Sequence, residues 1–169
     1  MKLTSQEEYG LRCLMRIASV GEGGSITIPE ISESEGISSF YVAKLLRILR
    51  RAGFIQAARG QVGGYRLVRG AGEINVGHVV AALGGRLFDG AFCEHHTGSV
   101  QRCAHSSDCT IRTVWRTVQL VVDQVLGKLT LQDLEAHNEA DMVPVVTHLV
   151  KLSESQMTGL REQALGLKN

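Results

Sequence analysis

The sequence predicts a mainly α-helical protein with one small β-hairpin, and three observations lead to this fold class. Apolar residues recur at helical spacing along much of the 169-residue chain, which contains only two prolines. Two strand-like stretches near residues 54–58 and 64–68 flank a glycine-rich turn. Hydrophobic residues make up 44% and charged residues 21% of the chain, which is typical of a protein with a packed core.

Composition also excludes several classes of protein. No stretch approaches the roughly 18 apolar residues of a membrane span, and the N-terminus lacks the pattern of a signal peptide. We therefore expect a cytoplasmic protein that does not associate with membranes. Four cysteines are too few for a disulfide scaffold, so we expect reduced thiols. The net charge of +1 says nothing about a partner.

The first three helices are predicted from apolar residues at helical spacing and from residues that cap helix ends. The first helix is expected from about Thr4 to Val20, with apolar residues repeating along one face. The second is short, because it begins at Thr27 with a capping pattern and meets Gly36 within two turns. The third runs from about Ser39 to Arg51. Two helices joined by a tight turn that contains glycine form a helix-turn-helix.

The outward face of the third helix is polar and basic. Residues 36–72 contain seven Lys or Arg residues and no Asp or Glu. A local basic patch favours a polyanionic partner, although a solvated charged face is the simpler alternative. As the first turns of a recognition helix meet base edges in the major groove, the expected contacts come from this face. They are Ser38, Ser39, Tyr41, Lys44 and Arg47.

The hairpin follows directly and is expected to be a wing. Its glycine-rich tip, residues 59–63, carries Arg59 and Gln61, which we expect to contact phosphate or the minor groove of double-stranded DNA. The sequence thus predicts a winged helix-turn-helix domain over residues 1–83, including a short helix at 74–83.

A long helix is predicted after the winged domain, followed by a short one from Thr130. Apolar residues between Ile111 and Val125 alternate at spacings of three and four, as in a two-helix seam. Packing within the same chain is one explanation, but a homodimer suits so long a seam better. We assign residues 110–139 to dimerisation. Residues 140–169 look weakly helical and have no assigned role.

Three cysteines, Cys93, Cys103 and Cys109, lie in a segment of residues 84–109 that shows little periodicity. His95, His96 and His105 lie among them. The cysteines suit an iron–sulfur cluster, either [2Fe–2S] or [4Fe–4S], or zinc with a histidine as fourth ligand. A metal-free thiol switch is the third alternative. Cys13 stands apart on the first helix and is expected in the core.

Several motifs together resemble the Rrf2 family of winged-helix transcription regulators over roughly residues 1–135. They are Met1–Thr4, Tyr9–Arg12, Ile28–Ile31, Gly36–Ser39, Tyr41, Arg59–Gly60, Gly63–Leu67 and the three cysteines before the long helix. The resemblance implies a homodimer that binds pseudo-palindromic operator DNA. In cysteine-bearing members an iron–sulfur cluster near the dimer interface changes DNA affinity in response to cluster supply, iron, nitric oxide or redox state.

The resemblance also implies ligands. Members with a carboxylate at the position of Glu8 use it as a ligand from the partner chain, so Glu8 is the first choice for the fourth ligand. Cluster-biogenesis members have a histidine three residues after the last cysteine, where this chain has Arg112. The expected protein is an iron–sulfur-dependent repressor. A Cys/His metalloenzyme is disfavoured, since the sequence offers no positioned base and no substrate-binding glycine loop.

Overall fold

The computed structural model describes residues 4–58, 63–86, 88, 92–97, 103, 105, 108–136, 138 and 140–151. Its elements are α1 (Ser5–Ala18), α2 (Ile28–Glu35), α3 (Ser39–Arg51), β1 (Ile55–Ala58), β2 (Gly64–Leu67), the 3-10 turn η1 (Ala71–Glu73), α4 (Val76–Gly84), α5 (Phe92–His95), α6 (Thr110–Leu126) and α7 (Leu131–Ala136). Residues 140–151 are also helical. The predicted fold class is confirmed: helices dominate, and the two strands form one antiparallel hairpin.

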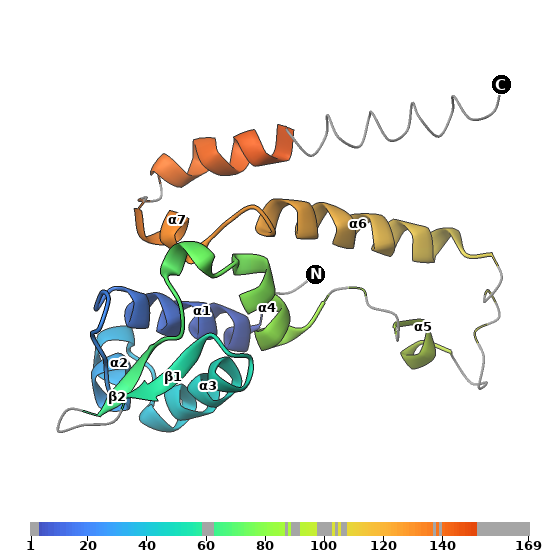
Figure 1. Cartoon of the computed structure of the whole chain (residues 1–169). Coiled ribbons are helices and arrows are strands. Elements are labelled where there is room, and N and C mark those ends of the chain that lie inside the picture. The colour runs from blue at the N-terminus through green and yellow to red at the C-terminus, as the bar shows by residue number, and fades with distance from the viewer. Residues whose placement is uncertain are drawn as a thin grey trace.

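The elements α1 to α4 and the hairpin form one domain, and α6 lies across it as a long rod (Figure 1). The core of this domain is built where the inner faces of α1, α2 and α3 meet. Leu14, Ile31, Leu45, Leu46 and Leu49 are all fully buried there. Burying one such side chain contributes roughly 1.5–3 kcal/mol, so this cluster holds the two helices of the helix-turn-helix in place.

Local signals set the ends of α2 and the start of α3, as the sequence predicts. The backbone N–H of Thr27 donates to the Glu30 carboxylate at 2.8 Å, within the expected capping box. Gly36 ends α2 with φ +65°, a left-handed conformation that favours glycine. The Ser38 side chain caps α3 by accepting a hydrogen bond from Tyr41 N–H at 3.3 Å.

The hairpin is attached to the domain by a third extended segment. Ile26 pairs with Tyr65 through two backbone hydrogen bonds, from Ile26 N–H to Tyr65 O at 3.1 Å and from Tyr65 N–H to Ile26 O at 2.8 Å. This close approach requires glycine at position 64, because a Cβ there would lie 2.7 Å from the carbonyl oxygen of Ile26. At Gly63 a Cβ would be 3.7 Å from its nearest neighbour, Ala58 O.

Replacing Gly64 with alanine is therefore expected to lower the free energy of unfolding by about 1–3 kcal/mol, because the hairpin must move away from Ile26. Gly63→Ala is the matched control, and we expect it to change stability little. Urea denaturation followed by circular dichroism measures both. Equal stability of the two variants would contradict the tight packing of Gly64 on Ile26.

The C-terminal end of α6 is fastened to the winged domain. The Asn75 side-chain amide donates to Gly127 O at 2.7 Å, and Val76 N–H donates to Leu129 O at 2.9 Å. Leu131, the first residue of α7, is fully buried in the core of the winged domain. The end of α6 therefore moves with the winged domain.

The structure corrects several expected boundaries. The first helix is shorter than Thr4 to Val20, because Thr4 is its N-cap and the helix ends at Ala18. The helix expected at 74–83 spans Val76–Gly84, since the Asn75 side chain accepts from His78 N–H and so caps it. The helical tendency expected after residue 140 is present as a helix over residues 140–151. No helix within the described ranges is both long enough and apolar enough to cross a membrane.

The cysteine segment is also more ordered at one point than its lack of periodicity suggests. Phe92–His95 form a short helix, α5. The His96 ring stacks on Phe92 with ring centroids 4.2 Å apart, and its Nδ1 lies 2.7 Å from Phe92 O. Such contacts between neighbouring side chains stabilise a single turn without a hydrophobic stripe, and periodicity therefore does not reveal it.

Candidate nucleic-acid interface and sensor segment

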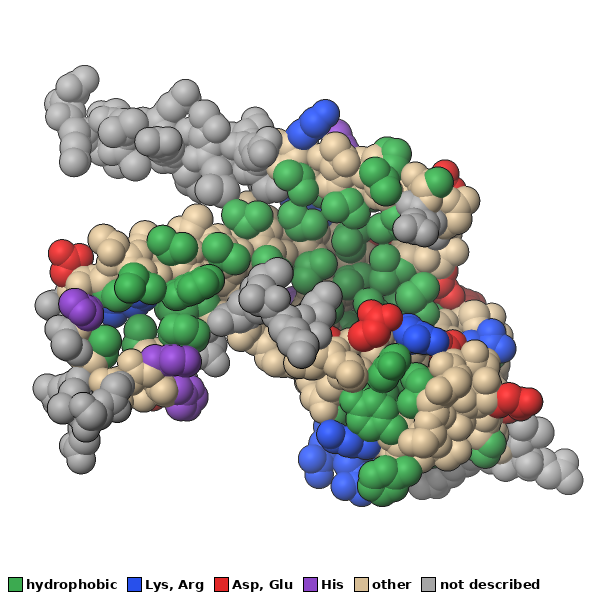
Figure 2. Space-filling view, turned by 180° about the vertical axis from the view of Figure 1, so that it is seen from behind, with side chains coloured by type: hydrophobic (Ala, Val, Ile, Leu, Met, Phe, Trp, Pro, Cys, Tyr) green, Lys and Arg blue, Asp and Glu red, His purple; other side chains and the backbone are tan. Residues whose placement is uncertain are grey.

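The outward face of α3 is placed as the sequence predicts for a recognition helix. Lys44 and Arg47 are exposed on it, and Ser38 and Ser39 lie exposed at its start. The Ser39 hydroxyl donates to the Ser32 hydroxyl at 3.0 Å, which links the two helices of the motif. Figure 2 shows Lys and Arg side chains gathered at the lower end of the molecule, where α3 lies in Figure 1.

Tyr41 is less available than the other expected contacts. Its ring is half-buried and meets the ring of Tyr9 edge-on, with centroids 6.1 Å apart. The Lys44 ammonium lies 5.6 Å from the centre of the Tyr41 ring. Tyr41 therefore packs α3 against α1 and supports the position of Lys44.

Sequence reasoning missed Phe40, whose side chain is 85% exposed at the start of α3. Helical spacing could have revealed it, because Phe40, Lys44 and Arg47 follow one another at i, i+4 and i+7 on one face. The expected wing contacts Arg59 and Gln61 lie outside the described residues. Arg66, on β2 of the wing, is exposed.

Cys93, Cys103 and Cys109, in the cysteine segment of residues 84–109, are half-buried, and all are free thiols. Cys93 lies on α5, and Cys109 is the N-cap of α6, where its Sγ accepts a hydrogen bond from Arg112 N–H at 3.3 Å. Glu8 is exposed in the first turn of α1. Within the part of the chain that the structure describes, no three His, Cys, Asp or Glu side chains are grouped so as to hold a metal ion.

Cys13 is also a free thiol, but it lies in a different environment from these three. It is fully buried on α1 in the hydrophobic core, as expected. Burial raises the pKa of the Cys13 thiol to about 11. Because the thiolate is the form that binds metals and attacks disulfides, Cys13 is a packing residue.

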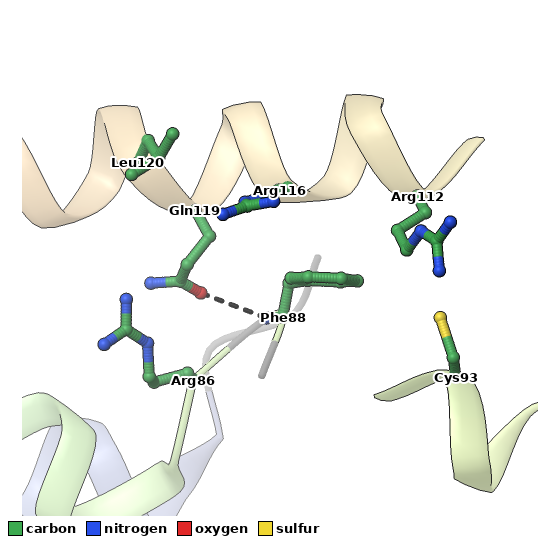
Figure 3. A pocket seen from close by; sticks show the side chains of 7 residues that line it. All are labelled: Arg86, Phe88, Cys93, Arg112, Arg116, Gln119 and Leu120. Atoms are coloured by element: carbon green, nitrogen blue, oxygen red, sulfur yellow. Dashed lines mark hydrogen bonds between the residues drawn. The ribbon is translucent and has the colours of Figure 1, made fainter. Parts of the chain in front are cut away.

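A cavity of about 550 Å³ lies between α6 and the segment that follows α4 (Figure 3). Its lining residues are Arg86, Phe88, Cys93, Arg112, Arg116, Gln119 and Leu120. The Arg112 side chain and the Cys93 thiol point toward one another. Arg86 pairs with Asp123, and the buried Gln119 accepts a hydrogen bond from Phe88 N–H at 3.0 Å. The cavity therefore brings positive charge beside one of the three cysteines of the cysteine segment.

The opposite face of α6 is apolar, and in the described part of the chain its N-terminal half is exposed. Ile111 is 64%, Val114 56% and Trp115 46% exposed. Figure 2 shows hydrophobic side chains along α6 and on the neighbouring helix of residues 140–151. Val118, Val121 and Val125, further along the same face, are half-buried. The N-terminal half of the seam is therefore not packed against the described part of its own chain, and packing within the chain covers only part of the C-terminal half.

Comparison with known proteins gives a consistent result. A family model named Rrf2 and described as an iron-dependent transcriptional regulator matches residues 3–137. The transcriptional regulator IscR of Aliivibrio salmonicida is 33% identical over 143 residues, which cover 85% of this chain and 82% of that protein.

Two solved structures share the fold. T. potens IscR is 28% identical with a TM-score of 0.64, over 83% of this chain and 90% of that one. The oxidized form of Staphylococcus aureus CymR is 27% identical with a TM-score of 0.63, over 82% of this chain and 99% of that one. These similarities are to regulators and not to enzymes, so the alternative of a Cys/His enzyme is dropped. With its winged domain, its basic recognition helix and a match over most of its length, the chain belongs to the Rrf2 family of transcriptional regulators.

Proposed function

We propose that the protein is a homodimeric repressor whose affinity for a pseudo-palindromic operator changes with the state of a bound iron–sulfur cluster. The cysteine segment, residues 84–109, would bind this cluster. One observation carries the proposal. The cysteine-bearing segment leads into one end of α6, through Cys109, while the other end of α6 is fastened to the winged domain through Asn75 and Leu131.

The donor set suits a cluster. Cys93, Cys103 and Cys109 are half-buried thiols on one segment, and iron–sulfur clusters are held by cysteine thiolates. The arginines beside Cys93 supply positive charge next to an anionic, thiolate-ligated group. Glu8 of the partner chain is the proposed fourth ligand. The bound cluster would supply redox chemistry and sensitivity to iron or nitric oxide.

The route from sensor to DNA runs along α6. This helix has 17 residues and is about 25 Å long. Dimerisation through its apolar face places two winged domains at a spacing that α6 determines. Ordering of the cysteine segment biases the position of the α6 N-terminus, and so decides whether both recognition helices reach half-sites about one DNA turn apart.

A thiol-based regulator of the same fold is the second candidate. It is favoured by the similarity of the fold to the oxidized form of Staphylococcus aureus CymR. Oxidation of two of the three half-buried thiols to a disulfide would order the same segment without a metal. Zinc held by the cysteines and a histidine is the third.

Anaerobic purification followed by operator binding tests the main proposal. The protein is expected to be brown, with visible absorbance, and the cluster-loaded and cluster-free forms should differ in affinity for the same operator. A colourless protein that contains zinc supports the zinc form instead. A colourless, metal-free protein whose DNA affinity responds to oxidants supports the thiol regulator.

Replacement of Arg59 with alanine is expected to weaken DNA binding for all sequences alike, because Arg59 is expected to contact phosphate. The slope of log affinity against log salt should fall by about one contact. Lys128→Ala is the control, since it removes one positive charge at the far end of α6, where Lys128 is exposed. Gel-shift titrations at several salt concentrations measure both, and an unchanged slope in Arg59→Ala would remove Arg59 from the interface.

A further inference from the structure

Phe40 has the highest exposure, 85%, of the large hydrophobic side chains in the described part of the chain. It is the second residue of α3, in the first turn after the cap Ser38. The other exposed hydrophobic side chains lie mainly on α6 and in residues 140–151, away from the helix-turn-helix. A solvent-exposed phenylalanine ring at the start of a recognition helix therefore needs its own explanation.

The ring is part of a continuous outward face. Phe40, Ala43, Lys44 and Arg47 stand at i, i+3, i+4 and i+7, and all four are exposed. The N-terminal part of this face is apolar, and the part that follows is cationic. Ala43, one turn further along, has too small a side chain to cover the Phe40 ring. With the N-terminal turns of α3 directed at base edges, the ring meets the bases and the cations meet the flanking phosphates.

We propose that Phe40 is a specificity-determining residue that packs on the 5-methyl group of a thymine in each half-site. The inference rests on the proposed DNA-binding function of α3. The thymine methyl is the apolar group that base pairs display in the major groove, and phenylalanine can contact it. The ring has no hydrogen-bonding group, so against the amino group of cytosine or adenine it would displace water without replacing the hydrogen bond. Thymine is therefore preferred.

The test compares thymine with uracil, which lacks only the 5-methyl group. An operator is selected from random DNA with the wild-type dimer, and each thymine is then replaced by uracil in turn. Each half-site is expected to contain one thymine that contacts Phe40. Replacing this thymine in one half-site should lower the affinity of the wild-type protein about four-fold, and replacing it in both half-sites about fifteen-fold. Phe40→Ala should bind the parent operator more weakly and show no further loss at that position.

Two comparisons make the result specific. Phe40→Ala should respond like the wild type at every other thymine. Val20→Ala, which shortens an exposed side chain in the turn after α1, should behave as the wild type throughout. Because the ring is so exposed, Phe40→Ala should also melt at the wild-type temperature. If Phe40→Ala loses affinity on uracil substitution at the same thymine as the wild type does, or if no thymine shows the effect, the inference is overturned.

Failure of the underlying function gives a different result. A wild-type protein that selects no DNA sequence over random DNA overturns the DNA-binding proposal for α3, and the role of Phe40 with it. Sequence-specific, salt-dependent binding that is indifferent to Phe40→Ala leaves the regulator function intact and rejects the thymine contact alone.

Discussion

Replacing Val118 with glutamate is expected to convert the protein into a monomer that binds its operator poorly. Val118 lies within the apolar face of α6, between Val114 and Val122. In a two-fold symmetric dimer the two new carboxylates would be buried near each other without a partner. An uncompensated buried charge costs about 3–5 kcal/mol, which corresponds to a rise of roughly a hundred-fold to several thousand-fold in the dimer dissociation constant. Sedimentation velocity at micromolar concentration measures the change.

Two further variants guard this result against misfolding. Val114 is 56% exposed in the single chain, so Val114→Glu should also give monomers without disturbing the chain's own packing. Thr113→Glu is the control, because Thr113 is exposed and lies away from the apolar face of the same helix. It should remain a dimer. A wild type that is already monomeric at micromolar concentration, or a dimeric Val114→Glu, would reject this interface.

Alanine at any one of Cys93, Cys103 or Cys109 is expected to abolish or strongly destabilise the visible chromophore, because each removes a thiolate that iron requires. Glu8→Ala should have a milder effect on the spectrum or on cluster stability, since water can replace a carboxylate at one iron. Reconstitution under argon, followed by iron and sulfide assay, measures cluster loading in every variant.

Cys13→Ala is the matched control for the three cysteine variants. The Cys13 thiol is fully buried in the core, and burial raises its pKa to about 11, so it should contribute nothing to the chromophore. Full iron and sulfide loading of Cys103→Ala would reject the three-thiolate site. An unaltered spectrum and stability in Glu8→Ala would move the fourth ligand to one of the histidines of the segment.

The helix-turn-helix and its caps could be predicted because their signals are local. Thr27 and Glu30 bond to each other three residues apart, and Gly36 takes its left-handed conformation inside one turn. The stripe of Val42, Leu45, Leu46 and Leu49 follows from helical periodicity alone, and all four side chains are fully buried. Each of these features depends on residues only a few positions apart, so it can be predicted from the local sequence.

The expected sites divide in the same way. The exposed positions of Lys44 and Arg47 follow from the period of α3, but the inward packing of Tyr41 depends on Tyr9 of another helix. Cys93 of α5 and the arginines of α6 line the same cavity, and this likewise depends on the position of α5 relative to α6. Short motifs thus predict which residues belong to a site. Contacts between helices decide which of these side chains remain exposed for binding.

The helices of the winged domain, the hairpin, the basic face and the family could all be predicted from the sequence alone. The tertiary structure decided that Gly64 must lack a side chain, because Ile26 approaches it from another segment. It also shows that Asn75 holds the end of α6, and that Ile111, Val114 and Trp115 on the opposite face of that helix are exposed. Asn75 and Gly127 are 52 residues apart, and a contact of this kind produces no periodic pattern in the sequence. It forms at one point between two segments, whose relative orientation depends on the packing of the whole core.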